Sequence, residues 1–490
     1  MGQDNRSKYG NILAYLCLAF LVMIWNGAYA SPDDTISDNE QEEEVAQTND
    51  KIDPFTQALI GAYLTNSELK SQLKAKFAND EEIPKALAGF RPSVQAVGST
   101  TSLRTDYQSI GSGANDTGPR ERFRARTEPT TGTATISQNL FKGGETKAQL
   151  ESAENLVKSS EYTFMDAEQT TLVNAVQAYT NVIFTQEAID FNLSNVKFLT
   201  IQVKAIEVGE KVGEKSLTDL EEAKSNLAKG EADLTSAEGE RQKANVVYET
   251  VIGSKPGLLA QPPKVKDFPI SREALIETAE ENSPLVLKAY YAWQQAKSDV
   301  DVKFAGFLPQ IDAQGQLQRS LRAQMRKDRS NSAQANVTLT VPFDTNGLVS
   351  ANTRQTTQIL SQRRYDLEQA RKTARQNAVQ AWEDYLTAKK QIQQFEATIV
   401  FATKARDGTE LQYREGEKSF TDLLKAQSDL LNAKSGLAQA KKNFVDAEHK
   451  VKAAAGTMTA IALDLPVERY DIQGHYEDTK YRIFGTSVKD

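Results

Sequence analysis

The distribution of apolar and polar positions divides the chain into two long helical windows and several short alternating stretches. Proline is absent from 130–255 and from 343–465 although the chain has 14 prolines, so both windows are free to form uninterrupted helix. In the first window, apolar residues recur three and four positions apart, which places them on one helical face. In the second, they also recur every seven positions, which predicts coiled-coil packing against neighbouring helices: Leu423, Leu430, Leu437, Phe444 and Val451.

Each window contains a near-identical phrase, GEKSLTDL at 213–220 and GEKSFTDL at 416–423. A glycine opens each phrase and interrupts the helical pattern, and the serine that follows precedes an aspartate by three positions. That spacing is typical of a capping box that starts a new helix. Each phrase therefore predicts the tip of a helical hairpin, and the helix from Gly144 to the first tip would be roughly 100 Å long at about 1.5 Å per residue.

The returning helices are shorter than the helices that lead to the tips. The pattern ends the first returning helix at 217–252 and the second at 419–456. We expect the helical run 284–304 to stack end to end on the first returning helix, so that the two together form a column that matches the leading helix in length. By the same length argument, we expect residues 54–87 to complete the column above the second.

Four short stretches alternate between apolar and polar residues, which predicts strands at about 91–100, 131–141, 309–318 and 335–343. Such a sheet ordinarily packs on a helix inside a soluble domain. Here the helices are committed to the hairpins, and strands of about ten residues with one apolar and one polar face fit a membrane β-barrel. Because four strands leave open edges, which lipid does not tolerate, several copies would have to pool their strands.

Basic residues cluster in the connection within each predicted strand pair. They can belong to solvated loops or contact anionic lipid head groups at the outer surface. The longer connection contains Arg120, Arg122, Arg124 and Arg126, and the other contains Arg319, Arg322, Arg326, Lys327 and Arg329.

The doubled phrase belongs to a tandem duplication. An offset of 203 residues also relates Gly144 to Gly347 and Leu220 to Leu423, and AGFRPSVQAVG at 88–98 resembles AGFLPQIDAQG at 305–315. The duplication predicts four regions: a first repeat at 54–253, an equatorial connection at 254–283, a second repeat at 284–457 and a C-terminal equatorial tail at 458–490.

The N-terminus has the order of an export signal. Arg6 and Lys8 precede an apolar run that is too short for an ordinary membrane anchor, and Ala28-Tyr29-Ala30 follows as a cleavage site. We therefore expect a signal peptide at 1–30 and an acidic, disordered lead-in at 31–53.

Composition argues against several classes of function. The formal net charge of −8 disfavours nucleic acid as a partner. The single cysteine, Cys17, lies in the signal peptide, and the two histidines, His449 and His475, lie on a predicted heptad helix and in the tail. We therefore expect no enzyme activity, no cofactor and no metal site. A periplasmic coiled-coil scaffold remains an alternative, although it does not explain the alternating strands.

Several motifs carry a resemblance to a known family: the two AGF-x-P strand entries, the turns LFKGG and PFDTNG, and YREGEKSFTDLLKAQSDLLNAKSGL at 413–437. In these motifs the chain resembles the TolC family of trimeric outer-membrane channel proteins. The resemblance implies a mainly α fold with membrane β-strands, in which three copies form a twelve-stranded β-barrel and an α-helical barrel across the periplasm. It also implies an exit duct for type I protein secretion, multidrug efflux or both. The implied partners are a periplasmic adaptor and an inner-membrane ABC exporter or proton-driven pump.

The resemblance further implies a gate between the tips. Tyr413 and Lys418 of one tip would bind Asp219 and Thr218 of the other and hold the periplasmic end shut. Lys418 stands where relatives have arginine, so this link should be weaker and not bidentate. Capping offers another role for Asp219.

Three more tip residues match family positions. Asp422 matches an inward-facing acid of the pore constriction, although Lys425 replaces a second acid one turn later and Asp422 also has a capping role. Gly213 and Gly416 match glycines that meet the adaptor in relatives.

Overall fold

The structure is a computed structural model, and it describes residues 53–109, 121–263, 265, 268–322, 328–343 and 345–486. The chain divides into two compact units, and the second, Asp53–Asp490, contains all of these residues. The predicted signal peptide at 1–30 and the acidic lead-in, apart from Asp53, lie outside the described residues. Arg120, Arg326 and Lys327 also lie outside them.

The fold is mainly α-helical with a contribution of β-strands, which confirms the predicted fold class. The helices are α3 (Pro54–Thr65), α4 (Ser67–Asp80), α5 (Glu82–Ala88), α6 (Glu145–Lys211), α7 (Leu217–Ile252), α8 (Arg272–Asn282), α9 (Pro284–Phe304), α10 (Leu348–Arg414), α11 (Phe420–Ala454) and α12 (Ile472–Lys480), with a 3₁₀ turn η2 (Ala305–Phe307). The strands are β1 (Ser93–Thr100), β2 (Leu103–Ser109), β3 (Glu121–Thr127), β4 (Thr130–Lys142), β5 (Gln310–Leu321) and β6 (Arg329–Thr340).

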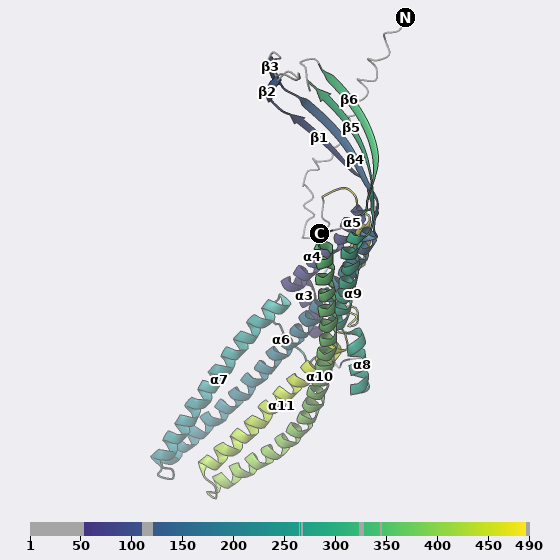
Figure 1. Cartoon of the computed structure of the whole chain (residues 1–490). Coiled ribbons are helices and arrows are strands. Elements are labelled where there is room, and N and C mark those ends of the chain that lie inside the picture. The colour runs from purple at the N-terminus through teal and green to yellow at the C-terminus, as the bar shows by residue number, and fades with distance from the viewer. Residues whose placement is uncertain are drawn as a thin grey trace. The chain divides into compact units, whose positions relative to one another are not determined.

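Two helical hairpins, α6–α7 and α10–α11, account for most of the helix. The leading helices α6 and α10 each have 67 residues. The hairpins meet through α6 and α11, so the four helices lie in the order α7, α6, α11, α10. Within this unit the strands lie at one end and the two hairpin tips at the other (Figure 1).

The two returning helices are extended by the opposite partners from those expected from the sequence. Thr65, at the end of α3, donates from its hydroxyl to the carbonyl of Ile252 at the end of α7, 3.1 Å away. Gly456, just beyond α11, lies against Asn282 and Pro284, where α9 begins. Thus α3 continues the column of α7, and α9 continues the column of α11.

The reason for this exchange is the path of the connection after α7. Helix α8 packs on α10 and α11 through a buried cluster that includes Leu275, Ala279, Ala378 and Val451. The connection therefore carries the chain to the second hairpin before α9 starts, and the helices after the lead-in fill the place left above α7. Helix lengths alone could not distinguish these two pairings.

The main hydrophobic core lies where α3 and α4 pack on α6 and α7, together with the segment after α11. The phenol of Tyr179 on α6 donates to the carbonyl of Ala260 at 2.8 Å and accepts from the Ala260 amide at 3.1 Å. The Glu168 carboxylate accepts from the amide of Ala460 at 2.7 Å. Burial raises the pKa of Glu168 and the pKa of Tyr179, the latter to about 12. These contacts fix both equatorial segments to the same helix.

Four strands form one antiparallel sheet in the order β1-β4-β5-β6. The register places residues of similar polarity beside one another across all four strands. One row joins Val94, Ile136, Gly315 and Ala335, and the next polar row joins Gln95, Thr135, Gln316 and Gln334. One face is therefore apolar and the other polar, as the alternation in the sequence predicts.

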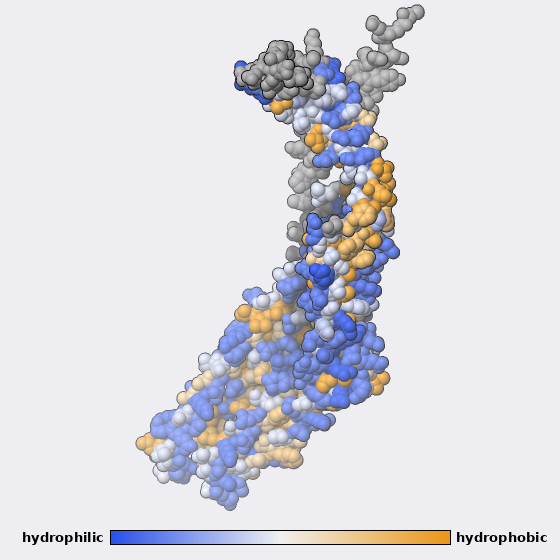
Figure 2. Space-filling model, in the orientation of Figure 1, coloured by the Kyte–Doolittle hydropathy of each residue, from blue (hydrophilic) through white to orange (hydrophobic). Residues whose placement is uncertain are grey.

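The apolar side chains of the sheet are exposed in the single chain. Val94 is 73% exposed and Val337 is 69% exposed. Figure 2 shows a hydrophobic band where the sheet approaches the helices. Phe141, at the end of β4 that leads to α6, and Leu339 and Val341, at the end of β6 that leads to α10, are exposed. A soluble protein rarely leaves such a face uncovered.

Part of the longer connection forms a second antiparallel hairpin, β2–β3, which the alternation in the sequence did not predict. Its strands have few apolar residues, so the alternation that revealed the other strands is missing. Arg104 instead faces Arg126 in the register, and Arg124 Nε lies 3.2 Å from Asp106 Oδ2.

Candidate functional site: the hairpin tips

The two tips close with the same hydrogen bonds, because the duplicated phrases adopt the same backbone conformation. In the first, the amides of Glu214 and Lys215 both donate to the carbonyl of Gly209, at 2.8 and 3.2 Å. In the second, the amides of Glu417 and Lys418 both donate to the carbonyl of Gln412, at 2.9 and 3.3 Å.

Gly213 and Gly416 occupy the left-handed region, with φ of 85° and 80°. Side chains other than glycine rarely adopt this conformation, and a glycine in it commonly ends a helix. Both residues are exposed, and a Cβ added to either would meet nothing within 4 Å. The two turns are therefore accessible, and their glycines are explained by the backbone alone.

A capping box starts each returning helix. The Asp219 amide donates to Ser216 Oγ at 3.1 Å, and the Ser216 amide donates to Asp219 Oδ2 at 3.1 Å. Ser419 and Asp422 repeat both bonds at 3.0 and 3.1 Å. In each box the serine holds the pKa of the aspartate below its usual range, mainly through its hydroxyl and to a smaller extent through its amide.

The tips contact each other within one chain through a small apolar cluster. Its buried members are Ile206, Leu220, Ala223 and Phe420, with Val203, Tyr413 and Leu424 packed against them. The Tyr413 ring centroid lies 5.9 Å from that of Phe420. Lys215 Nζ lies 4.6 Å from the Tyr413 ring centroid, a cation–π contact between the tips.

Polar links also join the two hairpins. Thr421 Oγ1 donates to Glu222 Oε1 at 3.1 Å, and Gln427 Nε2 donates to Asn195 Oδ1 at 3.3 Å. Glu222, Thr421 and Lys215 are not among the residues predicted from the sequence. Thr421 is the duplicate of Thr218, so the offset of 203 residues could have identified it.

The structure brings the predicted gate residues only partly together. Tyr413 is half-buried in the inter-tip cluster, whereas Lys418 and Thr218 are exposed and Asp219 belongs to its own cap. Among the described residues of one chain, no hydrogen bond joins Tyr413 or Lys418 to Asp219 or Thr218. Asp422, the predicted constriction residue, lies exposed at the start of α11.

The described ranges lack two kinds of feature. No helix there combines the length and hydropathy needed to cross a membrane. No group of three or more His, Cys, Asp or Glu residues there could hold a metal ion.

Long paired helices, a two-faced four-stranded sheet and exposed duplicated turns together define the class of outer-membrane channel proteins with periplasmic helices. The sequence profile described as "Outer membrane efflux protein" matches residues 62–254 and 275–457, which is more than half of the chain. The chain belongs to this family. It is therefore an outer-membrane protein that extends into the periplasm.

Curated relatives agree with this assignment. The chain is 28% identical to the outer membrane efflux protein BepC of Brucella suis over 439 residues, which cover 89% of this chain and 92% of that protein. It is 23% identical to the outer membrane protein TolC of Escherichia coli, with 81% of each chain covered.

Solved structures share the fold. The CmeC outer membrane channel of Campylobacter jejuni matches with a TM-score of 0.73 at 17% identity, covering 87% of this chain and 89% of that chain. The open state of the Neisseria gonorrhoeae MtrE outer membrane channel matches with a TM-score of 0.68 at 17% identity, covering 82% and 88%.

Proposed function

We propose that three copies of this chain form a continuous exit duct through the outer membrane and the periplasm. The duct would receive cargo from an inner-membrane pump through a periplasmic adaptor, and it would serve type I protein secretion, multidrug efflux or both. It performs no chemical reaction of its own. The names of the relatives BepC, CmeC and MtrE support transport through an outer-membrane channel.

The observation that carries this proposal is the sheet with two free edges. Within the described chain, β1 pairs only with β4 and β6 pairs only with β5. Unpaired backbone groups cannot remain exposed to lipid, so each edge needs another strand. Because the order is β1-β4-β5-β6 and all pairs are antiparallel, β6 of one copy can pair antiparallel with β1 of the next. Three copies then supply twelve strands, and the apolar face would contact lipid.

The helix order extends the same argument to the periplasmic part. Since α7 and α10 are the outer members of the row, α7 of one copy would lie beside α10 of the next. This arrangement would bring Asp219 and Thr218 of one copy to Tyr413 and Lys418 of its neighbour. The gate is therefore proposed as a contact between copies, and the contact of Thr421 with Glu222 would hold the tips together within a copy.

The accessible turns at Gly213 and Gly416 would meet the adaptor. At the opposite end, the arginines of β3 would contact anionic lipid head groups. Arg126 supports this role because its side chain is 74% exposed and its ion pair with Glu128 is long, at 3.8 Å.

Disulfide cross-linking between the two edges tests the trimer. The mature chain has no cysteine, so Gln95→Cys on β1 can be combined in turn with Gln334→Cys, Asn336→Cys or Thr338→Cys on β6. Three positions are needed because strands in a barrel are staggered. One combination should yield covalent trimers on a denaturing gel. The control is Gln316→Cys on the inner strand β5, which should remain monomeric. Failure of all three combinations in membranes would contradict the pairing of β6 with β1.

A further inference from the structure

A polar cavity lies in the helical wall where the column of α11 and α9 is interrupted. Helix α11 ends at Ala454, and α9 begins at Pro284. Around this break α6, α9, α10 and α11 surround a cavity of about 410 Å³. Small residues leave the space open, among them Ala374, Ala381 and Ala453. Binding sites for small molecules commonly have volumes of about 300–1,000 Å³.

The cavity lies on the side of α6 opposite the main core. Leu172, Val176 and Tyr179 point into that core, whereas Thr170 and Asn174 line the cavity. At about 100° per residue, Asn174 and Val176 lie on opposite faces of the helix. In the proposed trimer this face would line the duct, so the placement of the cavity in the duct rests on the proposed function. The chemical character of the residues that line the cavity is independent of that function.

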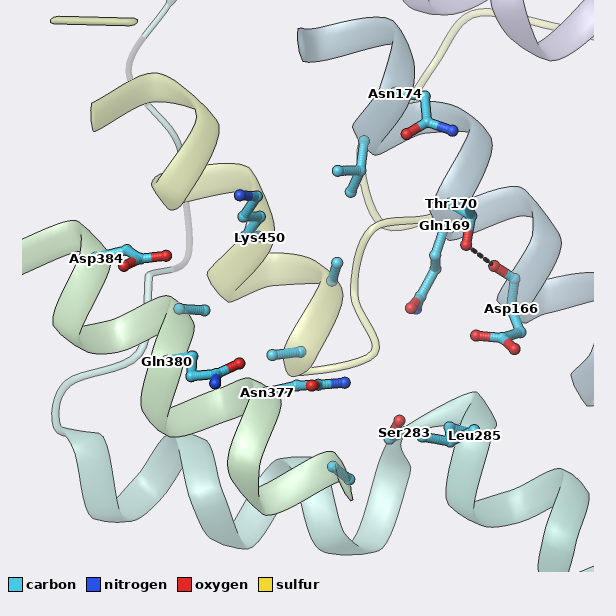
Figure 3. A pocket seen from close by; sticks show the side chains of 15 residues that line it. Asp166, Gln169, Thr170, Asn174, Ser283, Leu285, Asn377, Gln380, Asp384 and Lys450 are labelled. Carbon is cyan, nitrogen blue, oxygen red and sulfur yellow. Dashed lines mark hydrogen bonds between the residues drawn. The ribbon is translucent and has the colours of Figure 1, made fainter. Parts of the chain in front are cut away.

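One buried amide nitrogen at the cavity has no partner within the described chain. Gln169 is only 6% exposed, and within the described chain its Nε2 has no hydrogen-bond partner. Figure 3 shows the side chains of Gln169 and Asn377 extending into the space between α6 and α10. Among the cavity residues drawn there, the one hydrogen bond joins the Thr170 hydroxyl to the Asp166 carbonyl, at 2.9 Å. A buried amide without a partner is destabilising, so folded proteins normally satisfy it with protein, water or ligand.

Two side chains of opposite charge line the cavity. Lys450 on α11 and Asp384 on α10 both line the cavity (Figure 3), and in the described part of the chain no ion pair joins them. The third charged residue, Asp166, already has a partner, because Lys288 Nζ lies 2.7 Å from its Oδ2. Among the residues that the structure describes, neither Lys450 nor Asp384 has an ion-pair partner within 4 Å, so the cavity offers a cation and an anion together with amide groups.

We propose that this cavity binds a small zwitterionic solute, of the amino-acid class, that carries both an ammonium and a carboxylate group. The ammonium group would pair with Asp384 and the carboxylate with Lys450. The amide of Gln169 would donate to the polar body of the solute. Charged hydrogen bonds of this kind are about twice as strong as neutral ones, so both charges should matter for affinity.

Calorimetric titration of the purified full chain with L-glutamine tests this assignment. Putrescine, which has only ammonium groups, and succinate, which has only carboxylates, serve as comparison probes. Glutamine should bind saturably, and each comparison probe should bind at least about tenfold more weakly, equivalent to about 1.4 kcal/mol. Equal binding of putrescine or succinate would contradict the zwitterion assignment. The absence of saturable glutamine binding would mean that the cavity holds only water.

Matched variants test the site itself. Asp384→Asn and Lys450→Met should each weaken glutamine binding at least about tenfold. Glu383→Gln, at the neighbouring exposed position on α10, and Lys441→Met, on the same helix as Lys450, should leave the affinity within about twofold. Unchanged binding in both cavity variants would overturn the proposal. Because both cavity side chains are exposed, the variants should fold, and their channel conductance in a lipid bilayer reports separately on the proposed duct.

Discussion

Lys76 provides a quantitative test of how the C-terminal tail is held on α4. Its Nζ lies 2.8 Å from Asp80 Oδ2 and donates to the carbonyl of Ile472 on α12 at 2.9 Å. The His475 imidazole lies 2.9 Å from the same Asp80 oxygen and stacks on Phe77 at 3.9 Å between ring centroids. The side chains of Lys76 and Asp80 are 2% and 0% exposed. This cluster therefore joins α12 to α4 through a buried charge.

Lys76→Met keeps the length of the side chain but removes the charge. Removing one partner of a buried ion pair costs about 3–5 kcal/mol, because the remaining charge has neither water nor a counter-charge. The loss should lie near the lower end of that range because His475 still contacts Asp80. At about 1.4 kcal/mol per factor of ten, the opening equilibrium of α12 should rise by about 100-fold or more.

Lys211→Met is the matched control. Lys211 also pairs with a carboxylate one helical turn away, Glu207, at 2.9 Å, but their side chains are 66% and 46% exposed. An exposed pair of this kind contributes about 0–1 kcal/mol. Hydrogen exchange of the peptide 472–480 measures the opening of α12. Protection of 472–480 in Lys76→Met equal to that in the parent protein would refute the argument that the buried Lys76 pair holds α12.

Three further predictions concern the gate, pH and helix packing. Tyr413→Phe combined with Lys418→Ser should raise single-channel conductance without changing oligomeric mass, because it removes donors that would hold neighbouring tips together; unchanged conductance would place the gate elsewhere. Burial lowers the pKa of His449, so the unfolded chain binds a proton first and stability should fall as the pH drops below about 6.5 towards the lowered folded value. His449→Gln should reduce this fall in melting temperature, and an equal fall in both proteins would contradict it. Gly436→Ala should destabilise the fold by about 1–3 kcal/mol, because an added Cβ would lie 2.4 Å from the ring of Phe395. At Gly239 an added Cβ meets nothing within 4 Å, so Gly239→Ala should stabilise the fold by about 0.5–1 kcal/mol. Chemical denaturation would show shifts of opposite sign in the free energy of unfolding.

The helices and the apolar sheet could be predicted from the sequence because their patterns are local. The returning helix predicted at 217–252 has the same bounds as α7, since Ser216 caps its start and Gly253, with φ of 83°, follows its end. Apolar residues alternate along β5 and β6, and the register places them on one face.

Features that depend on distant contacts could not be predicted in the same way. The stacking of α3 on α7 depends on the path of the connection after α7, and helix lengths carry no information about that path. The β2–β3 hairpin has a charged sequence, so it gave no apolar alternation. At the tips, the duplicated phrase predicted both turns, but the bond between Thr421 and Glu222 joins residues 199 positions apart and leaves no local pattern.

The conductance of the purified protein in a planar lipid bilayer tests the central claim most directly. The protein should be extracted with detergent, and its particle mass determined before it is added to the bilayer. We predict a particle of three mature chains that produces discrete ion-conducting steps. A monodisperse single chain that is soluble without detergent and conducts no ions would contradict the account.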